Sequence, residues 1–242
     1  AAGLPDFGPV QNNMSLNAHR GATRGIHTEP WDKLVSVATG RVFAAWVDMR
    51  EGSSFGSVFH LEMGPDTAVF VPRGVGNSYQ ALEDGTVYSY LVNDHWRPGI
   101  SYPALHLGDP SCAIPWPIPL AEAEISEKDH ANPVLGAVTP VAPKKSLIIG
   151  ANGQLGRALH QRFPAADLVD LVADPARGVA SLDASDPQAL AGVAWRDYSV
   201  VLNAAAYTAV DAAESAEGRV TAWAANANAP ALLARAADEH GF

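Results

Sequence analysis

The stretch KKSLIIGANGQLGRAL, Lys144 to Leu159, decides how the second part of this 242-residue chain folds. An apolar run is followed by three glycines at G-x-x-G-x-x-G spacing and then by a helix-forming segment. This order is typical of the opening of a doubly wound dinucleotide-binding domain. There, Gly150 permits the tight turn, Gly153 lets the backbone approach a pyrophosphate, and Gly156 lets helix and strand pack closely.

The pattern continues to the end of the chain. Short apolar runs at 147–149, 168–172 and 200–203 predict parallel core strands, with alanine-rich helical segments between and after them. We therefore predict an α/β Rossmann part over residues 146–242. An acidic residue near the end of the second strand should meet a coenzyme ribose, and both Asp170 and Asp174 qualify.

The chain before this part has β patterning. KLVSVATGRVFAAWVDM, residues 33–49, contains two apolar runs joined at Thr39-Gly40, which is a hairpin-like signal. Further short apolar runs follow between Gly, Asp and Pro residues, and many short strands with frequent turns predict an all-β jelly roll. GAVTPVAPKKS has the composition of a linker. We place the jelly roll at residues 1–135, the linker at 136–145 and the Rossmann part at 146–242.

The composition excludes several classes of function. The net charge is −10 and no basic stripe is present, so we expect no nucleic-acid partner. No apolar run reaches the length of a membrane span. Cys112 is the only cysteine, which fits a reducing compartment such as the cytoplasm. No His-x-His pair with a downstream carboxylate occurs, so we expect no metal site.

Four features of the second part together carry a resemblance: the glycine loop, the segment LDASDP, the segment NAAAYTAVDAAE and Asn226. They are similar to the dTDP-4-dehydrorhamnose reductases, extended short-chain dehydrogenases that use NADPH or NADH. That family reduces a 4-keto sugar nucleotide with a Tyr-x-x-x-Lys pair. No lysine follows Lys145, so we expect a coenzyme-binding part that is truncated before this pair. The resemblance implies coenzyme contacts at Gly150, Gly153, Gln154, Leu155, Gly156, Asp183, Ala204, Ala205 and Thr208.

The first part carries a second resemblance. PVQNNMS, RGATRGIH, FVPRGVGNSYQAL, TVYSYLVNDHWRP and ISEKDHANP occur in this order. They resemble segments of the dTDP-4-dehydrorhamnose 3,5-epimerases, which are metal-free jelly rolls of the cupin type and usually dimers. The resemblance implies a homodimer formed through the jelly roll, and it implies that the family's opening strands are missing before Ala1.

The same resemblance assigns roles to residues. His27 would be the base that removes a proton from C5 and then C3 of a 4-keto-6-deoxy sugar, and Asp129 would orient its imidazole. Lys33 would face the enolate oxygen, and Tyr90 would return a proton from the opposite side. The dTDP-sugar substrate would be held by Gln11, Asn12, Asn13, Arg24, Asn77 and Lys128.

Three positions depart from the epimerase pattern. Asn77 stands where the family usually carries a histidine, Ala44 replaces a common acid, and Trp96 replaces a second tyrosine. Taken together, the two resemblances predict a fused enzyme for consecutive steps of dTDP-L-rhamnose synthesis. Two alternatives remain: a C5-only epimerase acting on another 4-keto-6-deoxy sugar nucleotide, or a non-catalytic sugar-nucleotide-binding or dimerisation module attached to the reductase.

Overall fold

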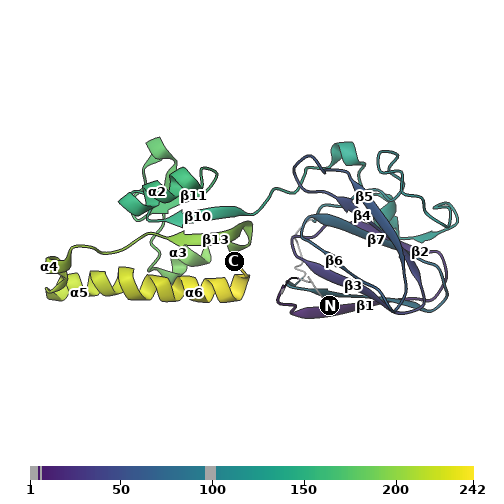
Figure 1. Cartoon of the computed structure of the whole chain (residues 1–242), viewed down its shortest axis with the longest axis horizontal. Coiled ribbons are helices and arrows are strands. Elements are labelled where there is room, and N and C mark those ends of the chain that lie inside the picture. Colours follow the sequence, from purple (N-terminus) through teal and green to yellow (C-terminus); the bar gives the residue numbers. More distant parts are fainter. Residues whose placement is uncertain (1–4, 6, 96–101) are drawn as a thin grey trace. The chain divides into compact units, whose positions relative to one another are not determined.

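The computed structural model describes residue 5, residues 7–95 and residues 102–242. These form two compact units, Ala1–Ala142 and Pro143–Phe242 (Figure 1). The first unit extends into the predicted linker because Val141 still pairs with it: its N–H donates to Met49 O, and its carbonyl accepts from Glu51 N.

The first unit is a jelly roll of two antiparallel sheets joined by short turns. One sheet has the strand order β1-β8-β3-β6, and the other has the order β5-β4-β7-β2-β9, in which only β9 runs parallel to its neighbour. The elements are β1 (Gln11–Asn17), β2 (Ala22–His27), β3 (Lys33–Thr39), β4 (Val42–Asp48), β5 (Val58–Met63), β6 (Ala68–Val71), β7 (Val75–Ala81), β8 (Thr86–Val92), β9 (Glu124–Ile125), α1 (Glu127–His130) and the 3-10 helix η1 (Leu135–Ala137).

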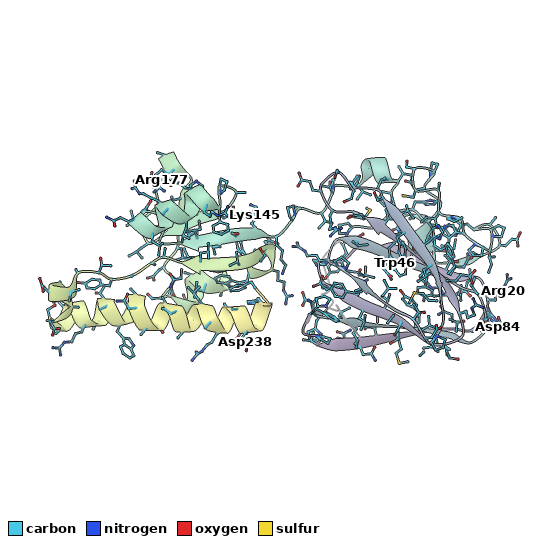
Figure 2. All side chains as sticks on the ribbon, viewed as in Figure 1. Arg20, Trp46, Asp84, Lys145, Arg177 and Asp238 are labelled. Carbon is cyan, nitrogen blue, oxygen red and sulfur yellow. The ribbon has the colours of Figure 1, made fainter. Side chains whose placement is uncertain are left out.

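The inner faces of the two sheets enclose one core. It includes Val35 and Val37 of β3, Trp46 of β4 and the stacked rings of Tyr79 and Tyr88. Figure 2 labels Trp46 among these strands. Because side chains alternate along a strand, this inner face holds every second residue of each strand. The outer face of the five-stranded sheet is buried separately, by loop residues that follow position 104.

The predicted hairpin at Thr39-Gly40 is wrong. The turn exists, and Gly40 has a φ of +76°, but the two strands that it joins belong to different sheets. β3 pairs with β6 and β8, whereas β4 pairs with β5 and β7. Both strands bury apolar side chains in the core between the sheets, and this burial is available only if the chain crosses from one sheet to the other at the turn.

The second unit contains a parallel sheet in the order β12-β11-β10-β13, which confirms the predicted Rossmann-like α/β fold. Leu147 and Ile149 of β10 face a helical layer that includes α6, and Ile148 faces the opposite side with Leu159 of α2. Figure 1 shows α5 and α6 as one continuous rod. The elements are β10 (Lys145–Ile149), α2 (Gln154–Arg162), β11 (Asp167–Asp170), the 3-10 helix η2 (Pro175–Arg177), β12 (Val179–Ser181), α3 (Pro187–Ala191), the 3-10 helix η3 (Trp195–Asp197), β13 (Tyr198–Asn203), α4 (Val210–Ala213), α5 (Ala216–Trp223), the π-helix η4 (Ala224–Asn228) and α6 (Ala229–His240).

Candidate functional site

A histidine and a carboxylate form a close pair at one end of the jelly roll. His27 is the last residue of β2, and its Nε2 lies 2.6 Å from Oδ1 of Asp129 in α1. Ser126 caps the N-terminus of the short helix α1, and its hydroxyl accepts a hydrogen bond from Asp129 N, so the helix cap positions the carboxylate. Asp129 is 2% exposed, whereas the His27 side chain is 37% exposed. The buried carboxylate thus holds an imidazole whose other edge remains accessible.

The charge of Asp129 determines the tautomer of His27. Burial acts to raise the pKa of Asp129, but the hydrogen bond and charge of His27, with bonds from Ser126 and Gly25, lower it below its ordinary value. The carboxylate is therefore ionised at neutral pH and can only accept a hydrogen bond, so Nε2 of His27 carries the proton. In the neutral imidazole, the lone pair is then on Nδ1, and this is the nitrogen that can act as a base.

A second polar group lies around Lys33, the first residue of β3. Its ammonium is buried, forms an ion pair with Glu29, and lies 5.5 Å from the centre of the Tyr90 ring. Burial, followed by the charge of Glu29, raises the pKa of Tyr90. The phenol therefore stays protonated at neutral pH and can donate a proton, while Lys33 supplies a fixed positive charge.

The three predicted substrate-binding residues of β1 lie on opposite faces of the sheet, because side chains alternate along a strand. Gln11 and Asn13 share a face, and Gln11 Nε2 donates to Asn13 Oδ1 at 2.6 Å. Asn13 pairs in register with Tyr90, so its side chain lies on the inner face. Asn12 has the opposite orientation, and its Oδ1 accepts from Ser89 Oγ at 3.1 Å on the outer face. The structure does not bring Asn12 to the other predicted residues.

The other three predicted substrate-binding residues, Asn77, Arg24 and Lys128, have different surroundings. Asn77 of β7 pairs in register with His27, which puts the two side chains on the same face of the sheet. Arg24 of β2 forms an ion pair with Glu124 at 2.7 Å. Lys128 is exposed on α1, next in sequence to Asp129. Trp96 lies outside the residues that the structure describes.

Four contributors to this site were missed by the sequence analysis. Glu29 and Glu124 form ion pairs with two of the three predicted cations, Lys33 and Arg24, and Trp46 and Tyr88 both donate hydrogen bonds to Asn77. A signal existed for Trp46, because strand alternation in β4 puts it on the buried side together with Ala44. Glu29 lies in the loop before β3, and the one sequence signal for it was its spacing of four residues from Lys33.

The second unit has a cavity of about 580 Å³ at the ends of its parallel strands. The glycine loop forms one side of it. Gly150 has a φ of +79°, and a Cβ there would lie 2.4 Å from Ala205 N, while a Cβ on Gly156 would lie 2.2 Å from Gly150 O. At Gly153 the nearest atom, Gly150 O, would be 3.4 Å away, so the backbone there is open to a ligand. The tight turn at Gly150 and the close packing at Gly156 are as predicted, whereas the approach of a pyrophosphate at Gly153 stays a prediction.

Only some of the residues predicted to contact the coenzyme line the cavity. Gly150, Gly153, Asp183, Ala204 and Ala205 line it. Four others do not contribute to its wall: Gln154, Leu155, Gly156 and Thr208. Other residues also line the cavity but were not predicted from the sequence, among them Leu182, Ser185, Tyr207, Val220, Thr221 and Ala224.

The structure distinguishes the two acidic residues that follow β11. Asp170 lines the cavity, and its Oδ2 accepts from Asn152 N at 2.8 Å. Asp174 is not in the cavity wall and instead precedes η2. Of the two candidates, only Asp170 therefore lies at the cavity.

Metal sites and membrane-spanning helices were sought among the residues that the structure describes. None of their His, Cys, Asp and Glu side chains form a group of three or more that could hold a metal ion. Within the same residues, no helix is long and apolar enough to cross a membrane. A cytoplasmic location stays a prediction.

Comparison with known proteins gives a separate result for each unit. Residues 1–136 match the sequence model of the dTDP-4-dehydrorhamnose 3,5-epimerase family, and residues 144–242 match that of the RmlD substrate binding domain. A protein RmlC homolog from Streptococcus pyogenes is 46% identical over 140 residues, which are 57% of this chain and 70% of that protein. A dTDP-4-dehydro-6-deoxyglucose 3-epimerase from Streptomyces bikiniensis is 34% identical over 137 residues, covering 54% of this chain and 68% of that protein.

Solved structures agree with the sequence matches. RmlC from Streptococcus suis, in complex with dTDP-D-xylose, superposes with a TM-score of 0.53 at 44% identity and covers 55% of this chain and 69% of that one. The dTDP-6-deoxy-D-glucose-3,5-epimerase RmlC from Legionella pneumophila, in complex with dTDP-4-keto-L-rhamnose, has a TM-score of 0.52 at 30% identity and covers 56% of this chain and 73% of that one. Both matches cover little more than half of this chain.

Proposed function

Because the chain belongs, through residues 1–136, to the dTDP-4-dehydrorhamnose 3,5-epimerase family, we propose that its jelly roll epimerises C3 and C5 of dTDP-4-keto-6-deoxyglucose. The observation that carries the proposal is the 2.6 Å pair of His27 and Asp129, which leaves the imidazole accessible on its other edge. The ligands in the related solved structures, dTDP-D-xylose and dTDP-4-keto-L-rhamnose, support a dTDP-sugar as substrate.

In this reaction, His27 removes the proton from the carbon next to the ketone. The C–H bond breaks, its proton goes to Nδ1, and its electron pair moves to give an enolate. Lys33 stabilises the negative oxygen with its ammonium. Tyr90 then returns a proton to the carbon from the opposite side, and the enolate collapses to the inverted ketone. Protonation on the side opposite to removal is what makes the reaction an epimerisation and not a simple exchange.

The second unit supplies the coenzyme site of a reductase that acts on the epimerised product. The cavity beside the glycine loop fits NADPH or NADH: the loop would hold the pyrophosphate at the start of α2, and Asp170 would meet the ribose. When bound, this coenzyme supplies a hydride for C4. The Tyr-x-x-x-Lys pair of such reductases is not contained in residues 146–242. Joining the two units raises the effective concentration of the first product near the second site.

The jelly roll forms a homodimer through the outer face of its four-stranded sheet. β1 is an edge strand of that sheet; Val10, just before it, is 56% exposed, and Met14 and Leu16 along it are 63% and 72% exposed. An exposed apolar row of this kind marks an interaction surface. We expect sedimentation equilibrium to give twice the chain mass of 25.4 kDa, and Leu16→Glu to give the mass of a single chain. A wild-type chain that is monomeric at micromolar concentration would contradict the dimer.

Solvent deuterium exchange tests the epimerase function. The full chain is incubated in deuterated water with dTDP-4-keto-6-deoxyglucose, and NMR and mass spectrometry locate the label. We expect label at both C3 and C5, because each proton is removed in turn and replaced from solvent. Label at one carbon only would identify a single-carbon epimerase. A folded chain that introduces no label would refute catalysis and leave a binding module. A heat-unfolded sample is the control for uncatalysed exchange.

A further inference from the structure

Three side chains at the start of β1 form a hydrogen-bonded relay that runs from the surface to the inner face of the sheet. Gln11 is its middle member: Nε2 donates to Asn13 Oδ1 at 2.6 Å, and Oε1 lies 2.8 Å from Nδ1 of His95. His95 is exposed, and its backbone is held by Asp94, whose Oδ1 accepts from His95 N at 2.6 Å. His95 is therefore the outer end of the relay, and Asn13 is its inner end.

The hydrogen bonds of the relay all run in one direction. An amide oxygen can only accept, so Oε1 of Gln11 requires that Nδ1 of His95 carry a proton. The same amide turns its nitrogen toward Asn13, whose own oxygen accepts the second bond. Because the oxygen of Asn13 is occupied in this way, the free side of its amide carries the N–H groups of Nδ2. The relay thus ends in hydrogen-bond donors.

The outer residue opposes a reversal of this direction. If both amides rotated by half a turn, Asn13 Nδ2 would donate to Gln11 Oε1, and the relay would end in an acceptor oxygen. The nitrogen of Gln11 would then face Nδ1 of His95, and two N–H groups would meet without an acceptor between them. A donor at position 95 therefore holds both amides as they are.

The inner end of the relay lies at the proposed epimerase site. Asn13 is directly opposite Tyr90 on β8, and directly opposed residues in a sheet have their Cβ atoms about 4.5–5.5 Å apart. Gln11 stands in the next row, with Val92 of β8 and Lys33 of β3. The pyrophosphate and ketone oxygens of a dTDP-sugar only accept hydrogen bonds. A relay that ends in donors therefore suits such a ligand, and a reversed relay does not.

We propose that His95 is a positioning residue for substrate binding: through Gln11, it holds the amide of Asn13 with its N–H groups directed into the site. The proposal rests on the epimerase function proposed above. In this role His95 touches neither the ligand nor the reacting carbons. Its effect is therefore on binding, and not on the proton transfers by His27 and Tyr90.

The first test replaces the His95 donor in two ways. Asparagine offers an amide N–H near the position of Nδ1, whereas leucine fills similar space and donates nothing. We expect His95→Leu to weaken the binding of dTDP-D-xylose, measured by calorimetry, about five- to tenfold, the effect of one lost hydrogen bond. His95→Asn keeps a donor and should bind within about twofold of wild type. The kcat of deuterium exchange should stay within about twofold in both variants, because only binding is changed.

Two results of this test would overturn the proposal. One is a His95→Leu chain that binds dTDP-D-xylose as tightly as the wild type does. The other is a His95→Asn chain that is impaired as much as His95→Leu, which would show that the imidazole acts by packing. The matched control is His19→Leu, at an exposed position after the other end of β1, which should leave binding and exchange unchanged.

The second test removes the middle of the relay. In a Gln11→Leu background, His95→Leu should weaken binding no further, because the connection to Asn13 is already interrupted. A further loss as large as in the wild-type background would show that His95 acts independently of Gln11 and would overturn the proposal.

Calorimetry separates this inference from the epimerase function, because the binding of dTDP-D-xylose requires no reaction. If the wild-type chain exchanges and His95→Leu binds the ligand equally well, the function stands and the role of His95 is refuted. If the wild-type chain introduces no label but binds with the expected dependence on His95, only the epimerase function is refuted. A wild-type chain that does not bind dTDP-D-xylose would refute the role of His95 whether or not it exchanges.

Discussion

Replacing His27 by asparagine is expected to lower deuterium exchange at both C3 and C5 by about 10²–10⁴-fold, the range that a positioned general base contributes. Asparagine keeps a polar, uncharged side chain at this position, but its amide is too short to replace Nε2, so the bond to Asp129 is lost together with the base. What the variant lacks is the nitrogen lone pair. The rate is measured by NMR at saturating substrate, with circular dichroism as evidence that the chain is folded and calorimetry as evidence that dTDP still binds.

Asp129→Asn is the companion to this variant. Without the negative charge, the imidazole loses its fixed tautomer and the stabilisation of its protonated form, so we expect a comparable loss of exchange. Because the two residues act as a unit, the double variant should lose little more than either single variant. A His27→Asn chain that exchanges at the wild-type rate would mean that another group removes the proton.

The ionisation of Asp129 also gives a direction for stability against pH. Its folded pKa is lower than its ordinary value of about 3.9, so its contribution to the free energy of unfolding is fully present above about pH 4. That contribution is lost as the pH falls through the lowered pKa.

The second large effect is expected at the glycine loop. A Cβ on Gly150 would lie 2.4 Å from Ala205 N and 2.7 Å from Ala204 C, in a backbone conformation with φ of +79°. Gly150→Ala therefore forces the end of β13 away from the loop, and both line the cavity. We expect the affinity for NADH and NADPH, measured by the fluorescence of the reduced nicotinamide, to fall at least about 100-fold, which corresponds to roughly 2.7 kcal/mol.

A matched glycine separates the steric effect from the backbone effect. Gly178 has a similar φ of +71°, but nothing lies within 4 Å of a Cβ placed there. Gly178→Ala should destabilise the unit by about 1 kcal/mol through its backbone alone and leave the affinity for the coenzyme within about twofold. If Gly150→Ala bound either coenzyme as tightly as Gly178→Ala does, the cavity would not be the coenzyme site.

Local patterns were sufficient to predict the fold class. Strand periodicity in the first part and the glycine loop in the second part depend on neighbouring residues, and both predictions are confirmed. The hairpin at Thr39-Gly40 failed because a turn signal does not say which sheet the next strand will join. That choice depends on contacts with strands much later in the chain.

The site was predictable where a motif or alternation carried it. Alternation along β1 is a signal in the sequence itself, and it separates Asn12 from Gln11 and Asn13. The arrangement around Asn77 could not be found in this way, because Trp46, 31 residues away, and Tyr88, 11 residues away, meet it only after three strands have aligned. Glu29 was equally hidden, since only the folded loop brings its carboxylate to Lys33.

The helix that completes the histidine pair comes late in the jelly roll. His27 and Asp129 are separated by 102 positions, so a ribosome synthesises almost the whole first unit before it adds the carboxylate. A nascent chain that has not reached α1 carries the imidazole without the group that sets its tautomer. The pair of His27 and Asp129 can therefore form only after nearly the whole first unit has been synthesised.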